Sequence, residues 1–312
     1  MSKAAIQELF ILHPYHHLIK TEEIRRDWID EVLFPKISQL RDSTSKILPA
    51  KSKSLYCLFY EPSFLTRTSF ERAMTILGGD VHHTEDASQF FPVKSVAHVD
   101  NVVEILASLH MDIVVIRHSD STVIDMAASV DALPIINGGT EGDHPTQALA
   151  DIYTMQRELG GIDGLSIAVV GRLEHRNVNS LLRLLSLYKN IRVMLVPLSG
   201  QIDPEVMAYC EERDMSLEIF ENIESALDVD AIYLNAPRTA AHINLLKSRN
   251  SFNLKINSKF MSSLRPHCIV LDPMQRSEDF EISVQDNRLA FYRQAENALY
   301  VRMGVVLNLL EA

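Results

Sequence analysis

Short apolar runs rich in Ile and Val recur along the whole chain, and segments long enough for a helix separate them. The runs cover residues 55–60, 112–117, 133–137, 165–170, 191–198, 217–220, 231–235 and 268–272. Runs of this kind are typical of strands buried on both faces, and helix-length connections favour parallel pairing. Because 312 residues exceed the usual size of one domain, the pattern predicts an α/β fold with two doubly wound parallel-sheet domains.

Ligands bind such sheets beyond the carboxyl ends of the strands, so the polar residues after each run are the first candidates for a site. These residues lie at 61–68, 117–118, 137–147, 171–176, 235–238 and 272–276. If the six loops converge, they form an active-site cleft between the two domains.

Composition excludes several classes of partner. A net charge of −11 argues against nucleic acid or an anionic membrane surface as the main partner. No run approaches the roughly 18 to 20 apolar residues of a membrane span, and the first residues do not resemble a signal peptide, so we expect a cytoplasmic protein. Cys57, Cys210 and Cys268 have no metal-binding spacing, and the histidines, His16 and His17 among them, lack metal-site partners. We therefore expect reduced structural thiols, no metal and no cofactor.

The segment at residues 61–71 places small hydroxyls and an arginine where a strand-like run gives way to a helix-like one. Phe70, Ala73, Met74 and Leu77 have helical spacing, and glycines follow them. The first turn of a helix carries unpaired N–H groups and the positive end of the helix dipole. The segment therefore predicts a strand, a phosphate-binding turn and a helix.

Together with His144-Pro145-Thr146-Gln147, this segment resembles the signature of the aspartate and ornithine carbamoyltransferases. Their phosphate turn reads Ser-Thr/x-Arg-Thr-Arg, then x-Ser-Phe-Glu, with His-Pro-Thr-Gln downstream. The turn in this chain departs from the pattern, because Phe64 replaces the usual hydroxyl and Leu65 replaces an arginine. The aspartate branch is the nearer one, and the resemblance implies transfer of a carbamoyl group from carbamoyl phosphate to L-aspartate in pyrimidine synthesis.

The resemblance also implies the residues that bind carbamoyl phosphate. The expected phosphate donors are Ser63, Thr66, Arg67 and Arg117. Donors to the carbonyl oxygen would be Thr66, Arg117 and His144, and Gln147 would hold the carbamoyl amide, so Thr66, Arg117, His144 and Gln147 are the expected catalytic residues. The loop at residues 272–276 would contribute Pro273 and Met274, although Asp272 stands where the family has a histidine.

For the amino acid, the resemblance implies Arg176, Arg238 and Lys94. Ala236 occupies the position of a second arginine in the family, and Arg238, two residues on, could restore the charge. Lys94 would reach the site of a neighbouring subunit, which implies a homotrimer with shared active sites and a possible regulatory chain. The expected domains are residues 1–145 with the C-terminal helix 296–312 for carbamoyl phosphate, and residues 146–295 for the amino acid.

Three hypotheses remain open at this point. The chain is a carbamoyltransferase acting on aspartate, a carbamoyltransferase with another amine acceptor, or a catalytically impaired homologue with a structural or regulatory role. The changes at Leu65, Ala236 and Asp272 keep the third hypothesis open.

Overall fold

The computed structural model describes residues 15–42, 48–84, 86–89, 98–235, 254–273 and 280–311. The chain divides into two compact units. Unit 1 comprises Met1–Thr146 and Asn297–Ala312, and unit 2 comprises Gln147–Glu296.

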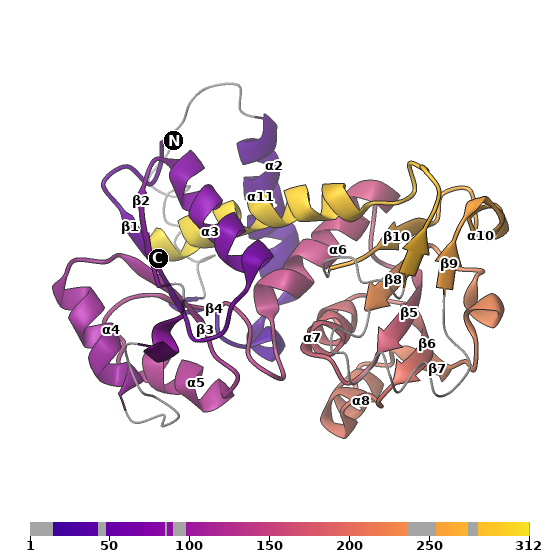
Figure 1. The fold of residues 1–312 in the computed structure, drawn as a ribbon, viewed down its shortest axis with the longest axis horizontal. Coiled ribbons are helices and arrows are strands. Elements are labelled where there is room, and N and C mark those ends of the chain that lie inside the picture. The colour runs from indigo at the N-terminus through magenta and orange to yellow at the C-terminus, as the bar shows by residue number, and fades with distance from the viewer. Residues whose placement is uncertain are drawn as a thin grey trace. The chain divides into compact units, whose positions relative to one another are not determined.

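Unit 1 contains a four-stranded parallel sheet in the order β2-β1-β3-β4 (Figure 1). The strands are β1 (Ser54–Phe59), β2 (Asp80–His83), β3 (Ile113–Arg117) and β4 (Ile135–Asn137). The chain moves outward from β1 to β2 and then returns to the other side of β1 to form β3. The strand order therefore reverses between β1 and β3, and the loops that leave these two strands diverge, which is where doubly wound sheets bind ligands.

Helices cover both faces of this sheet. On one face, α4 (Val99–Ser108) and α5 (Ser121–Ser129) pack their buried apolar residues against β1, β3 and β4. The other face carries α2 (Phe34–Asp42), α3 (Phe64–Leu77) and the unit 1 part of α11 (Phe291–Leu310) (Figure 1). Helix α11 contacts both neighbours there: the Arg302 guanidinium lies 5.2 Å from the centre of the Phe70 ring of α3, and Gly304 packs closely against Ile37 of α2.

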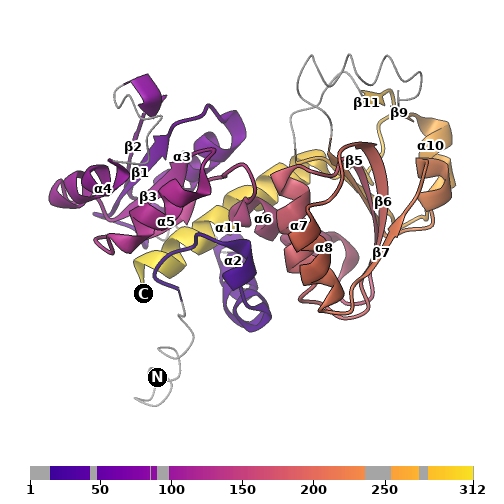
Figure 2. The ribbon, with the colours of Figure 1, turned by 90° about the horizontal axis from the view of Figure 1, so that it is seen from below.

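Unit 2 contains a five-stranded parallel sheet in the order β10-β8-β5-β6-β7. Its strands are β5 (Ser166–Arg172), β6 (Arg192–Ser199), β7 (Ser216–Ile219), β8 (Ala231–Asn235) and β10 (Ile269–Leu271). Here the order reverses between β5 and β8. In Figure 2, α7 (Arg176–Leu185) and α8 (Pro204–Glu211) lie side by side along one face of the sheet. The opposite face packs against η4 (Ile223–Ala226) and α10 (Ser258–Ser263).

The remaining elements are short, apart from α6 (Pro145–Leu159), in which the chain passes from unit 1 into unit 2. Strands β9 (Leu254–Ile256) and β11 (Phe280–Ile282) form a separate two-stranded parallel sheet. The other turns of helix are η1 (Thr21–Glu23), η2 (Trp28–Leu33) and η3 (Ala87–Gln89).

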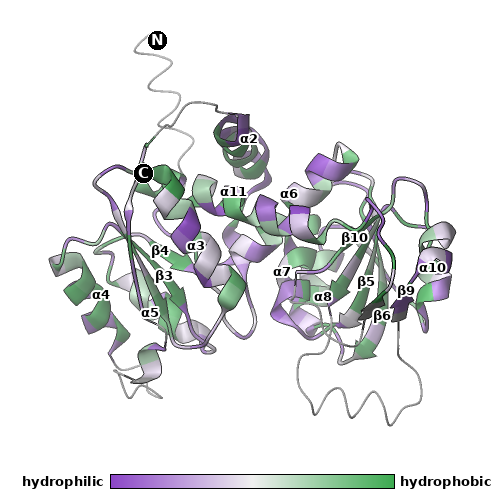
Figure 3. Cartoon of the chain, turned by 45° about the horizontal axis from the view of Figure 1, so that its top comes forward, coloured by the Kyte–Doolittle hydropathy of each residue, from purple (hydrophilic) through white to green (hydrophobic). Residues whose placement is uncertain are grey.

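The structure confirms the predicted architecture of two parallel-sheet α/β domains. The central strands are apolar along their length, as Figure 3 shows for β3, β4 and β5, and they are almost wholly buried. The three cysteines are free and buried, and burial raises the pKa of Cys57, Cys210 and Cys268, so they remain thiols at neutral pH. In the described part of the chain, none of the helices has the length and apolarity to cross a membrane.

Two helix starts and one sheet differ from the prediction. Helix α3 begins at Phe64, before Phe70, the first residue of the predicted helical spacing, because its first turn combines exposed Phe64 with buried Thr66 and carries no apolar periodicity. Helix α11 begins at Phe291, five residues before the predicted start at residue 296, since Gln294 N–H already donates to Ala290 C=O. The pairing of β9 with β11 was not predicted, because three-residue strands are too short for a periodic signal.

Candidate active site

In unit 1 the carboxyl ends of β1, β3 and β4 meet at one edge of the sheet. The register pairs Phe59 of β1 with Arg117 of β3, and Ile116 with Asn137 of β4. Tyr60 N–H continues the ladder with a 2.9 Å hydrogen bond to Arg117 C=O. Four residues predicted from the sequence lie at or after these strand ends, namely Ser63, Thr66, Arg117 and His144.

Thr66 and His144 form the first contact of this site. They are 78 positions apart in the chain, and Thr66 Oγ1 lies 3.3 Å from His144 Nε2. Both side chains are nearly inaccessible to solvent, with 5% and 4% exposure. The backbone of His144 is fixed by Asp143, whose carboxylate accepts hydrogen bonds from His144 N–H at 2.9 Å and from the backbone N–H and hydroxyl of Thr21.

Arg117 lies next to His144. Its Nη1 donates a 3.0 Å hydrogen bond to Gly138 C=O, and its Nε lies 4.0 Å from Glu61 Oε2. Gly139 has φ +117°, and a Cβ added there would lie 2.4 Å from Arg117 Nη1 and 3.2 Å from His144 Cδ2. Only glycine suits this position, and the two side chains flank it closely. Thr66, Arg117 and His144 therefore gather in one buried cluster, which we call the unit 1 cluster.

Two of the predicted phosphate donors, Ser63 and Arg67, lie at the start of α3. Ser63 precedes the helix in an extended conformation, and its side chain makes no capping hydrogen bond. Arg67 Nε lies 3.5 Å from Glu71 Oε1, which also lies 3.0 Å from His83 Nδ1. In this structure the Arg67 guanidinium thus forms an ion pair with Glu71, one turn further along α3. At the two altered positions, Phe64 is 69% exposed and Leu65 is half-buried.

In unit 2, Gln147 is 4% exposed and donates from Nε2 to Asp151 Oδ1 at 2.8 Å. Asp151 is fully buried and also accepts from Tyr233 Oη at 2.8 Å and from Gln294 Nε2 at 2.7 Å. Gln294 Oε1 in turn accepts from Asp272 N–H at 2.9 Å. Burial and the charge of Asp151 raise the pKa of Tyr233 well above its ordinary value, so Tyr233 remains a donor.

Arg176 follows β5 in the chain, at the edge of the sheet where the strand order reverses between β5 and β8. Asn235, at the end of β8, donates from Nδ2 to Arg172 C=O at 2.6 Å and so joins the ends of the two strands. Arg176 is the first residue of α7, directly after the N-cap residue His175, which accepts a hydrogen bond from Asn177 N–H. Arg176 is half-buried.

Three predicted site residues, Lys94, Arg238 and Met274, lie outside the described residues, as does Ala236. Pro273 is described and buried. Asp272, which stands where the family has a histidine, is 7% exposed.

One group of possible metal ligands occurs among the described residues, formed by His16, His17 and Asp131. His17 Nδ1 accepts a 3.1 Å hydrogen bond from Ile135 N–H, so the proton of the neutral ring is on Nε2, which faces Asp131 at 3.5 Å. A ligating nitrogen needs its lone pair free, and the other ring nitrogen of a metal-bound histidine normally donates. His17 has the opposite arrangement, so this group does not suit a metal.

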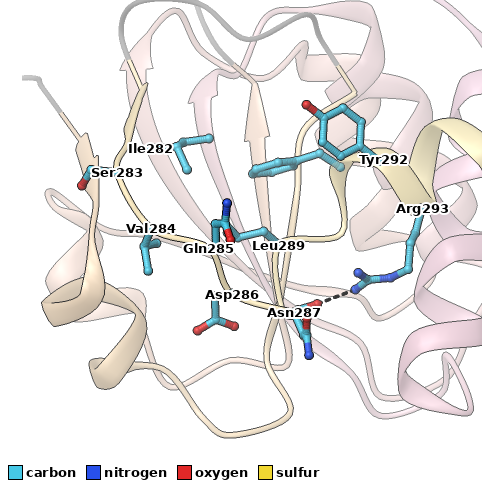
Figure 4. Close-up of a pocket in the computed structure, with 10 residues that line it drawn as sticks. Ile282, Ser283, Val284, Gln285, Asp286, Asn287, Leu289, Tyr292 and Arg293 are labelled. Carbon is cyan, nitrogen blue, oxygen red and sulfur yellow. Dashed lines mark hydrogen bonds between the residues drawn. The ribbon is translucent and has the colours of Figure 1, made fainter.

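Unit 2 also has a cavity of about 780 Å³ beside β11 and the start of α11 (Figure 4). Its charged groups are paired within the protein. Asp286 binds Arg288 at 2.7 Å, and Arg293 Nη2 donates to Glu158 at 2.9 Å. Arg293 Nη2 also donates to Asn287 C=O at 2.7 Å, the dashed line in Figure 4. None of the predicted site residues within the described part of the chain lines it.

Sequence reasoning missed Gly139, Asp151 and Gln294. A signal for Asp151 exists, because Gln147 and Asp151 are four residues apart in the sequence, a spacing that places both on one face of a helix such as α6. Gln294 has no comparable local signal, because its partners Asp151 and Asp272 are distant in the sequence.

Two family models match the chain. Residues 16–157 match the carbamoyl-phosphate-binding domain of aspartate/ornithine carbamoyltransferases, and residues 163–309 match their aspartate/ornithine-binding domain. The catalytic subunit of aspartate carbamoyltransferase from Methanococcus vannielii is 34% identical over 93% of this chain and 96% of its own length. The multifunctional protein CAD of Squalus acanthias is 34% identical over 96% of this chain, which spans only 14% of that protein.

A solved structure is similar along nearly the whole chain. Aspartate transcarbamoylase from Trypanosoma cruzi, in complex with carbamoyl phosphate and aspartate, superposes with a TM-score of 0.83 at 26% identity. The match covers 94% of this chain and 96% of that one.

Proposed function

Because the chain belongs to the aspartate/ornithine carbamoyltransferase family, we propose that it transfers the carbamoyl group of carbamoyl phosphate to L-aspartate. The products would be N-carbamoyl-aspartate and phosphate, and the reaction is a step of pyrimidine biosynthesis. The observation that carries this proposal is the unit 1 cluster, which brings together Thr66 of α3, Arg117 at the end of β3 and His144 of the loop before α6.

The reaction needs no covalent nucleophile. The amine attacks the carbonyl carbon and negative charge develops on the carbonyl oxygen. The bond from that carbon to the phosphate oxygen then breaks, and the departing phosphate takes up the proton that the amine loses. Arg117, Thr66 and His144 would donate hydrogen bonds to that oxygen, and donors placed there stabilise the transition state more than the ground state. Burial of the cluster strengthens these interactions, because little water competes with them.

The phosphate would bind at the first turn of α3, where N–H groups and the helix dipole favour an anion. Ser63, whose hydroxyl does not cap the helix, and Thr66 are suited to donate there. Arg117 adds a guanidinium that matches phosphate oxygens in geometry. Arg67 would contribute only after its guanidinium leaves Glu71, so we assign it the weaker role.

In unit 2, Gln147 would hold the carbamoyl amide, together with the backbone of Pro273 and Met274. Arg176 would bind a carboxylate of aspartate, and Arg238 and Lys94 would supply further positive charge. We propose that unit 1 is the carbamoyl-phosphate domain and unit 2 the amino-acid domain. We further propose a cytoplasmic homotrimer in which Lys94 serves a neighbouring subunit.

Two observations favour a second candidate, a catalytically impaired homologue. Leu65 places an apolar side chain in the turn where the family has a cation, and Arg67 is engaged with Glu71. Isothermal titration with carbamoyl phosphate, followed by product assays with aspartate, ornithine and other amines, distinguishes the candidates. Binding with turnover of aspartate supports the main proposal. Turnover of another amine alone would identify a different acceptor. If the protein neither binds carbamoyl phosphate nor forms a product, the impaired homologue is supported.

We expect Leu65→Arg to increase the affinity for carbamoyl phosphate, or kcat/KM for this substrate, by about 10- to 100-fold. One charge-assisted hydrogen bond contributes about 1.5–3 kcal/mol. The measurements are the dissociation constant by titration and kcat/KM for carbamoyl phosphate. Thr68→Arg is the matched control, since it adds the same charge at an exposed position on α3. Equal effects of the two substitutions, or no gain from Leu65→Arg in a folded protein, would contradict this placement of the turn.

A further inference from the structure

Asp151 is a carboxylate with no solvent exposure, and three side chains from different elements donate hydrogen bonds to it. Gln147 belongs to the same helix, α6, while Tyr233 comes from β8 and Gln294 from α11. An ionised carboxylate is costly to bury unless donors satisfy it. Such a group has to contribute something that an apolar residue of the same size would not.

What Asp151 contributes is the orientation of two amides. An ionised carboxylate can only accept hydrogen bonds, so the nitrogen end of each neighbouring amide must face it. For Gln147 this turns Oε1 away from Asp151. For Gln294 it turns Oε1 toward Asp272 N–H, which can only donate, and the observed 2.9 Å hydrogen bond fits that direction.

We propose that Asp151 is a positioning residue that fixes the Gln147 oxygen as an acceptor for the N–H of a carbamoyl group and, through Gln294, holds the backbone at Asp272. The inference rests on the proposed function, because it names the group that Gln147 recognises. It gives the buried network a chemical consequence: a fixed acceptor distinguishes a ligand with an amide N–H from one without it.

The test compares two ligands. Inorganic phosphate fits the phosphate turn but has no amide, whereas carbamoyl phosphate has both groups. Asp151→Asn keeps the size of the side chain but offers a donor as well as an acceptor. The side-chain amides of Gln147 and Gln294 can then rotate to present either their oxygen or their nitrogen. We expect this variant to bind carbamoyl phosphate about 3- to 10-fold more weakly, the loss typical of one neutral hydrogen bond. Its affinity for inorganic phosphate should change less than about twofold.

Thr154→Val is the matched control, because Thr154 is also buried on α6 and donates to Ala150 C=O at 2.7 Å. It should lower thermal stability without changing the ratio of the two affinities, which separates positioning from a general effect on folding. If Asp151→Asn does not fold, Gln294→Leu, which breaks the link to Asp272, should shift the ratio in the same direction.

The outcomes are distinct. An equal loss for both ligands in a folded variant, or no loss for either, overturns the positioning role while leaving the proposed function standing. Failure of the unaltered protein to bind carbamoyl phosphate overturns the proposed function, and the inference with it.

Discussion

Replacing Arg117 with alanine is expected to lower kcat/KM for carbamoyl transfer by about 100- to 1000-fold, the usual effect of removing one donor aimed at a developing oxyanion. The guanidinium is 5% exposed and held by Gly138 C=O and Glu61. Water therefore cannot readily take the place of this donor once the side chain is removed. Arg117→Lys should recover only part of the loss, because an ammonium lacks the planar pair of donors.

The measurement is steady-state kinetics with both substrates, alongside thermal unfolding to show that the variant is folded. Arg192→Ala serves as the control, since Arg192 lies at the surface, where it pairs with Glu218, and should leave activity unchanged. A folded Arg117→Ala variant with the activity of the unaltered protein would remove Arg117 from the proposed site.

Gly171→Ala is expected to lower the free energy of unfolding by about 4 kcal/mol or more, a loss large enough to unfold many single domains. Gly171 has φ +133°, and a Cβ at this position would lie 2.0 Å from Asn235 C=O. The neighbouring strand cannot yield, because that oxygen belongs to the backbone of β8. Chemical denaturation, with loss of the folded signal of unit 2, measures the effect.

Two other glycines separate the causes. Gly161→Ala meets no atom within 4 Å and has an ordinary backbone, so it should be neutral. Gly164→Ala has open space but φ +81°, so it should cost only the backbone strain, about 1 kcal/mol. If Gly171→Ala is no worse than Gly164→Ala, the close approach of β5 and β8 is not a constraint on this fold.

The sequence predicted the architecture because its strands are apolar on both faces, and such runs are recognisable without any tertiary information. It also predicted that Thr66, Arg117 and His144 matter, and the structure gathers all three in one cluster. The roles assigned to them remain predictions. What could not be read from the chain depends on partners that are distant in sequence.

The state of Arg67 illustrates this limit. A motif shows that an arginine is present, but whether it faces a phosphate or a neighbouring glutamate depends on the helix that begins at Phe64. Asp151 shows the same limit more strongly. Its spacing from Gln147 is a local signal, but its contacts with Tyr233 of β8 and Gln294 of α11 are not contained in any local pattern.

The division of unit 1 into two stretches of chain has a consequence for biosynthesis. Helix α11 supplies the fully buried Arg302, and its Asn308 accepts a 3.2 Å hydrogen bond from Trp28. The ribosome must complete all of unit 2, about 150 residues, before the unit 1 part of this helix is made. At about 5–20 residues per second, the face of unit 1 that α11 covers waits roughly 8 to 30 s for its partner. All of unit 2 is therefore synthesised while unit 1 still lacks the helix that covers this face.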